Sequence, residues 1–142
     1  MLPAIGHIDG YPPPDGWLPF VVGFTTYLYD VAPRGGAFVY WPDSHIATHQ
    51  YFLSHPKEID GSYRRHENWP RRMLPEEHNT PVEFLGKAGD TLIWDSFLFH
   101  SGSVNVNPTP RFGIVARFSH RRTEDPVYRY EVPEDLWKYW AI

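Results

Sequence analysis

The chain has 142 residues, a length that one domain can fill around a single hydrophobic core. Its formal net charge of −4 offers no general attraction for nucleic acid or an anionic membrane, so we expect neither as a partner. The absence of cysteine excludes disulfides, thiolate metal sites and cysteine nucleophiles, so that any metal ion must bind through histidine and carboxylate ligands.

Short strands and turns dominate the predicted secondary structure, because 17% aromatic residues accompany 15 prolines and 11 glycines. We predict one all-β domain over residues 1–142. Its seven candidate strands lie near residues 3–8, 20–30, 36–41, 82–86, 91–95, 97–101 and 111–119. The sequence shows no signal peptide, membrane span or peroxisomal C-terminal signal, so we expect a cytoplasmic protein.

The first candidate strand leads into His7 and Asp9. Residues two apart on a strand face the same side, so both side chains can reach one metal ion. The pair alone is a weak motif, since His-x-Asp arises often by chance.

A short helical turn over residues 44–52 follows the strands at 20–30 and 36–41. It would place His45 and His49 four residues apart on one face, a spacing that can bind zinc. No glutamate occupies the catalytic position of a metalloprotease helix between them, and we interpret both histidines as structural.

The segment 53–81 is too long for a simple connection between two strands, and we predict that it is a partly helical insertion loop. Its basic residues surround one indole, an arrangement that could clamp an anionic substrate. The residues of this candidate substrate site are Arg64, Arg65, Trp69, Arg71 and Arg72. The alternative is a solvated loop in which neighbouring glutamates neutralise the arginines.

Turn-forming residues between the strands ending at His100 and beginning at Arg111 predict a hairpin. His100 and Arg111 would then face each other a few ångströms apart. With His7 and Asp9, His100 completes a set of two histidines and one carboxylate, which holds non-haem Fe(II) on one face. Arg111 offers a planar fork for a carboxylate, whereas Arg117, about 20 Å further along the strand, is predicted to lie too far from His100.

Three polar residues near this hairpin are interpreted as structural. Asp90 should shape the turn at a strand entry, Asp95 should favour a reversal through Asx hydrogen bonding, and Asn105 should hold the loop before Arg111 together.

The sequence resembles the phytanoyl-CoA dioxygenase family of Fe(II)/2-oxoglutarate-dependent oxygenases. The resemblance rests on HID at 7–9, GGAFVYWPDSH at 35–45, AGDTLIWDSFLFHSGSVN at 88–105, and Arg111. It implies a double-stranded β-helix, a jelly roll of eight strands. Members normally carry a long N-terminal region and a first strand before His-x-Asp, so we expect a domain that lacks its first strand and is N-terminally incomplete. An open sheet edge would fit either a monomer or a homodimer.

The resemblance further implies His7, Asp9 and His100 as ligands of a catalytic Fe(II), and Arg111 as the residue that binds 2-oxoglutarate. With O2, such an enzyme hydroxylates a C–H bond of a small organic substrate and releases succinate and CO2. A carboxylate at Asp9 favours hydroxylation over halogenation, which leaves that position to chloride. Two alternatives stay open: a cupin-like metalloenzyme that does not use 2-oxoglutarate, and a truncated jelly-roll module that binds a metal or ligand without turnover.

Overall fold

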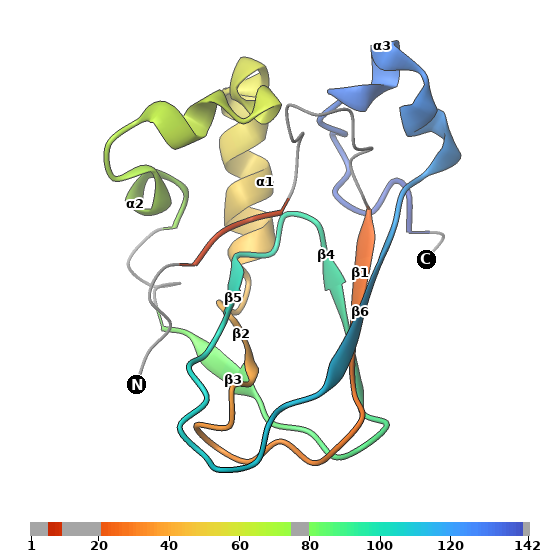
Figure 1. Ribbon diagram of the computed structural model, residues 1–142. Coiled ribbons are helices and arrows are strands. Elements are labelled where there is room, and N and C mark those ends of the chain that lie inside the picture. The colour runs from red at the N-terminus through yellow and green to blue at the C-terminus, as the bar shows by residue number, and fades with distance from the viewer. Residues whose placement is uncertain (1–5, 10–20, 75–79, 141–142) are drawn as a thin grey trace.

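The computed structural model describes residues 6–9, 21–74 and 80–140 of the chain, but not the side chains of residues 70 and 71 (Figure 1). Six strands form two three-stranded antiparallel sheets, with the orders β4-β1-β6 and β3-β2-β5. The strands are β1 (Val22–Tyr27), β2 (Phe38–Tyr40), β3 (Val82–Phe84), β4 (Thr91–Asp95), β5 (His100–Gly102) and β6 (Gly113–Phe118). The prediction of a β-rich fold is therefore confirmed, and six of the seven predicted ranges overlap a strand.

Helical segments occupy the insertion and the C-terminal part. They are α1 (Ser44–Ser54), η1 (Pro56–Asp60), η2 (Ser62–Arg65), α2 (Trp69–Met73), η4 (Arg121–Glu124) and α3 (Pro126–Arg129). Figure 1 shows α1 and α2 beside the sheet that contains β5, and α3 beyond the ends of β1 and β6. None of the described helices is long and apolar enough to cross a membrane.

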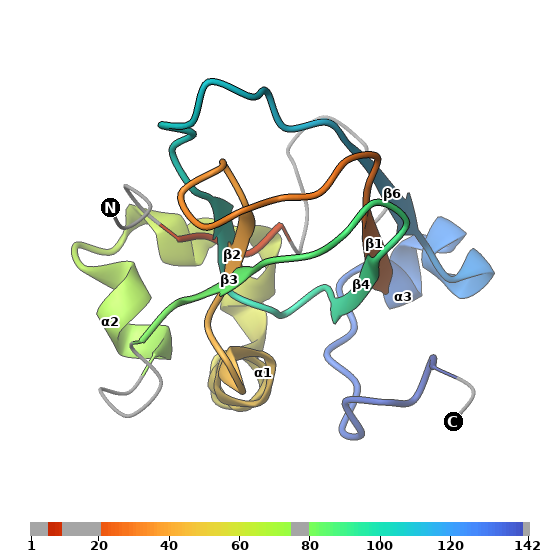
Figure 2. The same ribbon diagram turned by 90° about the horizontal axis from the view of Figure 1, so that it is seen from below.

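The hairpin predicted between β5 and β6 is wrong, because the two strands belong to different sheets. His100 pairs with Tyr40 of β2, whereas Gly113 pairs with Tyr27 of β1. The intervening loop passes from one sheet to the other (Figure 2). Its polar residues bind the turn before β2: Asn105 pairs with Gly35, and the Asn107 amide donates to the Pro33 carbonyl.

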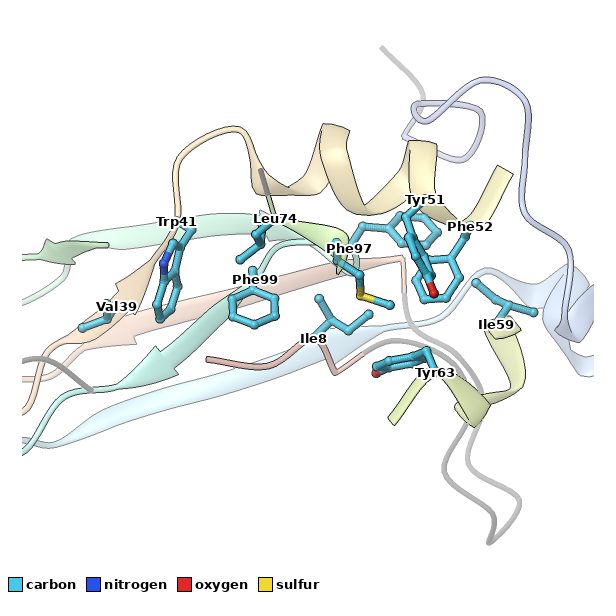
Figure 3. Close-up of a cluster of buried hydrophobic side chains, with 11 residues drawn as sticks. Ile8, Val39, Trp41, Tyr51, Phe52, Ile59, Tyr63, Leu74, Phe97 and Phe99 are labelled. Carbon is cyan, nitrogen blue, oxygen red and sulfur yellow. The ribbon is translucent and has the colours of Figure 1, made fainter. Parts of the chain in front are cut away.

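A large buried cluster lies between α1, the insertion and the β5 sheet (Figure 3). Its buried members are Ile8, Val39, Trp41, Tyr51, Phe52, Ile59, Tyr63, Met73, Leu74, Phe97 and Phe99. Ile8 is only 1% exposed and anchors the N-terminal segment in this cluster. The neighbours of Ile8 are thereby turned to the opposite side, since side chains alternate along extended backbone.

The two sheets meet through aromatic side chains. The alternation along β1 buries Thr25 and Tyr27. The Tyr27 hydroxyl accepts a 2.8 Å hydrogen bond from the Phe38 amide and donates one of 2.9 Å to the Phe84 carbonyl, which ties β1 to the opposite sheet. Trp94 packs on Phe38 and donates its indole N–H to the Thr25 hydroxyl.

Candidate metal centre

His7 and His100 face each other across an isolated antiparallel bridge. Their backbones exchange two hydrogen bonds of 2.8 Å, so the residues form a directly opposed pair. Opposed residues project to the same side of a sheet, and the two imidazole rings lie 4.6 Å apart between centroids. Residues remote in the chain are therefore brought together by backbone pairing as well as by side-chain packing.

Asp9 joins the two histidines because Ile8 is fixed in the core. Its Oδ1 lies 3.2 Å from His7 Nε2, and its Oδ2 lies 3.7 Å from His100 Nε2. Among the described residues, these three side chains form the one group of three whose ligand atoms converge, all within 4.8 Å of one another.

This geometry fits a small divalent ion. Bonds of about 2.1 Å at right angles place neighbouring ligand atoms about 3 Å apart, close to the His7–Asp9 separation. The set contains nitrogen and oxygen atoms only, a combination of two histidines and one carboxylate that can bind one face of non-haem Fe(II).

The hydrogen bonding of His100 prepares it to bind a metal. Its Nδ1 lies 2.9 Å from the Leu98 carbonyl oxygen, which can only accept, so Nδ1 carries the proton and Nε2 presents its lone pair to the site. Burial lowers the pKa of His100 to about 4, against the smaller opposing effects of Leu98 and Asp9. His100 is therefore neutral, the form that binds metals, down to mildly acid pH.

Asp9 is held in its ionised form. Burial by itself raises the pKa of this carboxyl, but the hydrogen bond from His7 and the charges of His100 and Arg117 outweigh it and hold the pKa well below the usual range. There is thus a wide pH interval in which His100 is neutral and Asp9 is ionised, the forms in which each binds a cation.

Arg111 lies just before β6 and does not face His100 across a hairpin. A methyl group added to Gly113 would lie 3.6 Å from Arg111 Nη1 and 3.5 Å from Tyr27, which places the guanidinium beside the buried Tyr27 ring. Tyr27 contacts the Phe38 backbone, and the Phe38 ring stacks on His100 at 5.1 Å. Arg111 is exposed and lies just before β6, which belongs to the sheet opposite the one that contains β5.

The prediction that Arg117 lies too far from His100 is wrong. Its guanidinium donates a hydrogen bond to Asp9 Oδ2 and forms an ion pair with that carboxylate. The sequence argument measured distance along β6 from Arg111, but the partner of Arg117 comes from the N-terminal segment that carries Asp9.

The candidate substrate residues of the insertion have separate partners. Arg64 donates to the Tyr63 hydroxyl and to the Ile8 carbonyl, so it fixes the segment between two metal-site residues. The Trp69 ring packs against Phe99 in the core cluster. Arg72 lies 5.7 Å over the ring of Tyr51.

Two further arginines complete that set. Arg65 is exposed and its charge acts on Asp60, while the Arg71 side chain lies outside the described part of the structure. A substrate clamp built from this set stays a prediction.

The structural interpretation of the other polar residues agrees with their contacts. His49 Nε2 lies 2.6 Å from the Pro133 carbonyl, and the His45 ring lies against Trp137. Asp95 accepts from the Phe97 amide, two residues on, as an Asx turn requires, whereas Asp90 holds its turn by accepting from the Lys87 amide, three residues before it. The sequence did not indicate that Asp95 is buried. Its carboxylate also accepts a hydrogen bond from the Trp140 indole, and burial raises its pKa to about 6.

The side chains that enclose His100 were also missed. The Trp94 ring lies 4.5 Å from the His100 ring. Gly23 makes room for it, since a methyl group there would approach the indole to 2.4 Å. The signal available in the sequence was a glycine inside a strand pattern, which often marks a close approach.

Two comparisons with known proteins gave matches. A family model described as "Phytanoyl-CoA dioxygenase (PhyH)" matches residues 7–113. The structure is similar to the crystal structure of the non-heme alpha ketoglutarate dependent carbocyclase SnoK from nogalamycin biosynthesis, with a TM-score of 0.54 and 21% identity. That alignment covers 82% of this chain and 44% of the carbocyclase chain. It shows a common fold, and this chain spans less than half the length of the carbocyclase. No curated protein matched the sequence.

Proposed function

The chain belongs to the phytanoyl-CoA dioxygenase family, and from this premise we propose that it is an Fe(II)- and 2-oxoglutarate-dependent oxygenase. The reaction that we propose is hydroxylation of a C–H bond in a small organic substrate. One atom of O2 enters the alcohol and the other enters succinate, while the 2-oxo acid loses CO2. The convergence of His7, Asp9 and His100 within 4.8 Å is the observation that carries the proposal.

The proposed fold is a jelly roll in which the two sheets enclose the centre. In this arrangement His7, Asp9 and His100 would hold Fe(II) through their converging ligand atoms. Bound Fe(II) would supply the chemistry that activates O2 for attack on a C–H bond.

Arg111 is the proposed anchor for the distal carboxylate of 2-oxoglutarate. A guanidinium pairs with a carboxylate through two parallel hydrogen bonds, which fixes both the position and the direction of the co-substrate. The place of Arg111 near Tyr27 supports this role, since the Tyr27 hydroxyl accepts from the amide of Phe38, whose ring stacks on His100. The Tyr27 ring is fully buried and would exclude water from one side of that ion pair.

Aromatic rings around His100 would protect the reaction from solvent. Phe38 and Trp94 pack on the imidazole at 5.1 and 4.5 Å, and the His100 side chain is only 5% exposed. His7 is 47% exposed at the opposite side, so we propose that the organic substrate approaches past His7.

Anaerobic titration of the Fe(II)-loaded protein with 2-oxoglutarate tests the proposal. Chelation of Fe(II) by the 2-oxo acid should produce a visible charge-transfer band, and admission of O2 with ascorbate should yield succinate. Arg111→Ala should raise the 2-oxoglutarate concentration needed for half of the band at least about tenfold, since it removes a charge-assisted pair. Arg121→Gln removes an exposed arginine outside the site and should leave the titration unchanged.

Other outcomes separate the alternatives. Metal binding without any charge-transfer band would favour the cupin-like enzyme or the non-catalytic binding module, and O2 consumption without succinate would favour the former. A band that forms equally well with Arg111→Ala would assign the anchor to another residue.

A further inference from the structure

Arg117 carries a role at the metal centre that neither the family motif nor the sequence pattern assigns. It lies beyond residues 7–113, the part matched by the family model. On β6 it is paired with Gly23 of β1, one residue before the strand ends at Phe118. The side chain nevertheless reaches Asp9, the proposed carboxylate ligand.

The surroundings of Arg117 direct it toward Asp9. Its guanidinium carbon lies 5.9 Å from the centre of the Trp94 ring, which occupies the space left by Gly23. The hydrogen bond goes to Oδ2 of Asp9, whereas Oδ1 faces His7 Nε2 at 3.2 Å. Oδ2 also lies 3.7 Å from His100 Nε2, so each oxygen faces a histidine, but only Oδ2 accepts from the Arg117 guanidinium.

The hydrogen bond from Arg117 to one oxygen matters because a carboxylate can bind a metal through one oxygen or through both. An octahedral ion held by two histidines and one carboxylate oxygen keeps three positions open. A chelating 2-oxo acid fills two of them and leaves one for O2. If both oxygens of Asp9 bound the ion, the same co-substrate would fill the last positions.

We propose that Arg117 is a positioning residue that holds Oδ2 of Asp9 and so restricts Asp9 to one metal bond, which preserves the coordination position for O2. The inference rests on the proposed function for its consequence, but the binding mode of Asp9 is a property of the metal-loaded protein alone. The Asp9 side chain is 19% exposed and the Arg117 side chain is 48% exposed, so their ion pair is shielded from water mainly on the carboxylate side.

The test counts the water molecules bound to Mn(II), which takes the same ligand types as Fe(II) and is stable in air. Broadening of the Mn(II) electron paramagnetic resonance lines in 17O-enriched water gives this count. The unsubstituted protein should hold three waters, falling to one when 2-oxoglutarate is added. Arg117→Met keeps the packing on Trp94 but releases Oδ2, so it should hold two waters and none after 2-oxoglutarate is added.

Two variants act as controls. Arg117→Lys keeps a cation that can donate to Asp9 and should retain three waters, and Arg121→Gln should match the unsubstituted protein. If Arg117→Met does not fold, as judged by circular dichroism, the count on Arg117→Leu, which also cannot donate to Asp9, decides in its place. Kinetically, Arg117→Met should lower the rate of succinate formation at least about tenfold while the KM for 2-oxoglutarate changes less than about threefold, because Arg111 is intact.

Equal water counts in the unsubstituted protein and Arg117→Met would overturn the inference, as would failure of the unsubstituted protein to bind Mn(II). Failure of the proposed function gives a different result. In that case Mn(II) binds with three waters and 2-oxoglutarate displaces none. The binding mode of Asp9 is then still read from the difference in water count between the unsubstituted protein and Arg117→Met, measured without 2-oxoglutarate.

Discussion

Gly23→Ala is a small substitution with a large expected effect, because Gly23 lies under the indole that packs on His100. In register, Gly23 pairs with Trp94 on one side and with Arg117 on the other. An added methyl group would lie 2.4 Å from Trp94 Cε2 and 2.5 Å from Cζ2. Carbon atoms pack at about 3.5 to 4.0 Å, so the ring has to move by about 1 Å or more.

The structure gives the magnitude. Overpacking in a filled interior costs about 1–3 kcal/mol, and displacement of Trp94 also breaks its buried hydrogen bond to Thr25, worth about 1 kcal/mol. We therefore expect Gly23→Ala to lower the free energy of unfolding by about 2–4 kcal/mol. The melting temperature should fall by about 5–15 °C for a chain of this size.

Urea unfolding followed by circular dichroism measures the loss, and Mn(II) titration measures the effect on the centre. Gly102→Ala is the matched control, since Gly102 is also in a strand and follows His100 closely, but nothing lies within 4 Å of its added methyl group. Gly102→Ala should change stability by less than about 1 kcal/mol. If Gly23→Ala were as stable as Gly102→Ala and bound Mn(II) equally well, the argument from Trp94 would be refuted.

Further predictions concern the pH dependence of stability and the segment that carries His7, Ile8 and Asp9. Burial raises the pKa of Asp95 to about 6, so the stability that its protonated form contributes is complete below about pH 4 and is lost as the pH rises through 6, a fall of about 3 kcal/mol. Burial lowers the pKa of His100 to about 4, which makes stability rise between about pH 4 and 6.5, so Asp95→Asn should unmask a rising urea stability over that interval in the metal-free protein. A flat profile of Asp95→Asn would contradict the His100 assignment, and identical profiles of the two proteins would contradict the Asp95 assignment. Ile8→Ala should cost about 2–4 kcal/mol in urea unfolding and weaken Mn(II) binding, whereas retained metal affinity would show that Ile8 does not orient its neighbours. Asp9→Asn should weaken Mn(II) binding at least about 100-fold in the same titration, and an unchanged affinity would remove Asp9 from the ligand set.

Local patterns predicted the parts of this protein that depend on neighbouring residues. Alternation along extended backbone placed His7 and Asp9 on one side, and the burial of Ile8 between them shows why. The turn chemistry of Asp95 was also confirmed by its hydrogen bond from the Phe97 amide. Such features follow from the chain within a few residues of the position in question.

Features that depend on distant partners were not predictable in the same way. The turn-rich loop after His100 fits a hairpin, but β6 forms a six-residue pairing with β1, so β5 and β6 end in separate sheets. Arg117 was excluded by distance along one strand, although Asp9 reaches it from the other end of the chain. Trp140, which donates to Asp95, likewise comes from a segment whose position the sequence pattern did not fix.

The backbone bridge between His7 and His100 couples the lifetime of the protein to the occupancy of the proposed metal centre. That bridge joins the N-terminal segment to β5, and a bound metal ion would link the same two residues through their side chains. At a free ion concentration of about 100 times Kd, binding would raise the free energy of unfolding by about 2.7 kcal/mol. Iron-starved protein should therefore release this segment more often and be degraded faster by proteases than protein made in iron-replete cells.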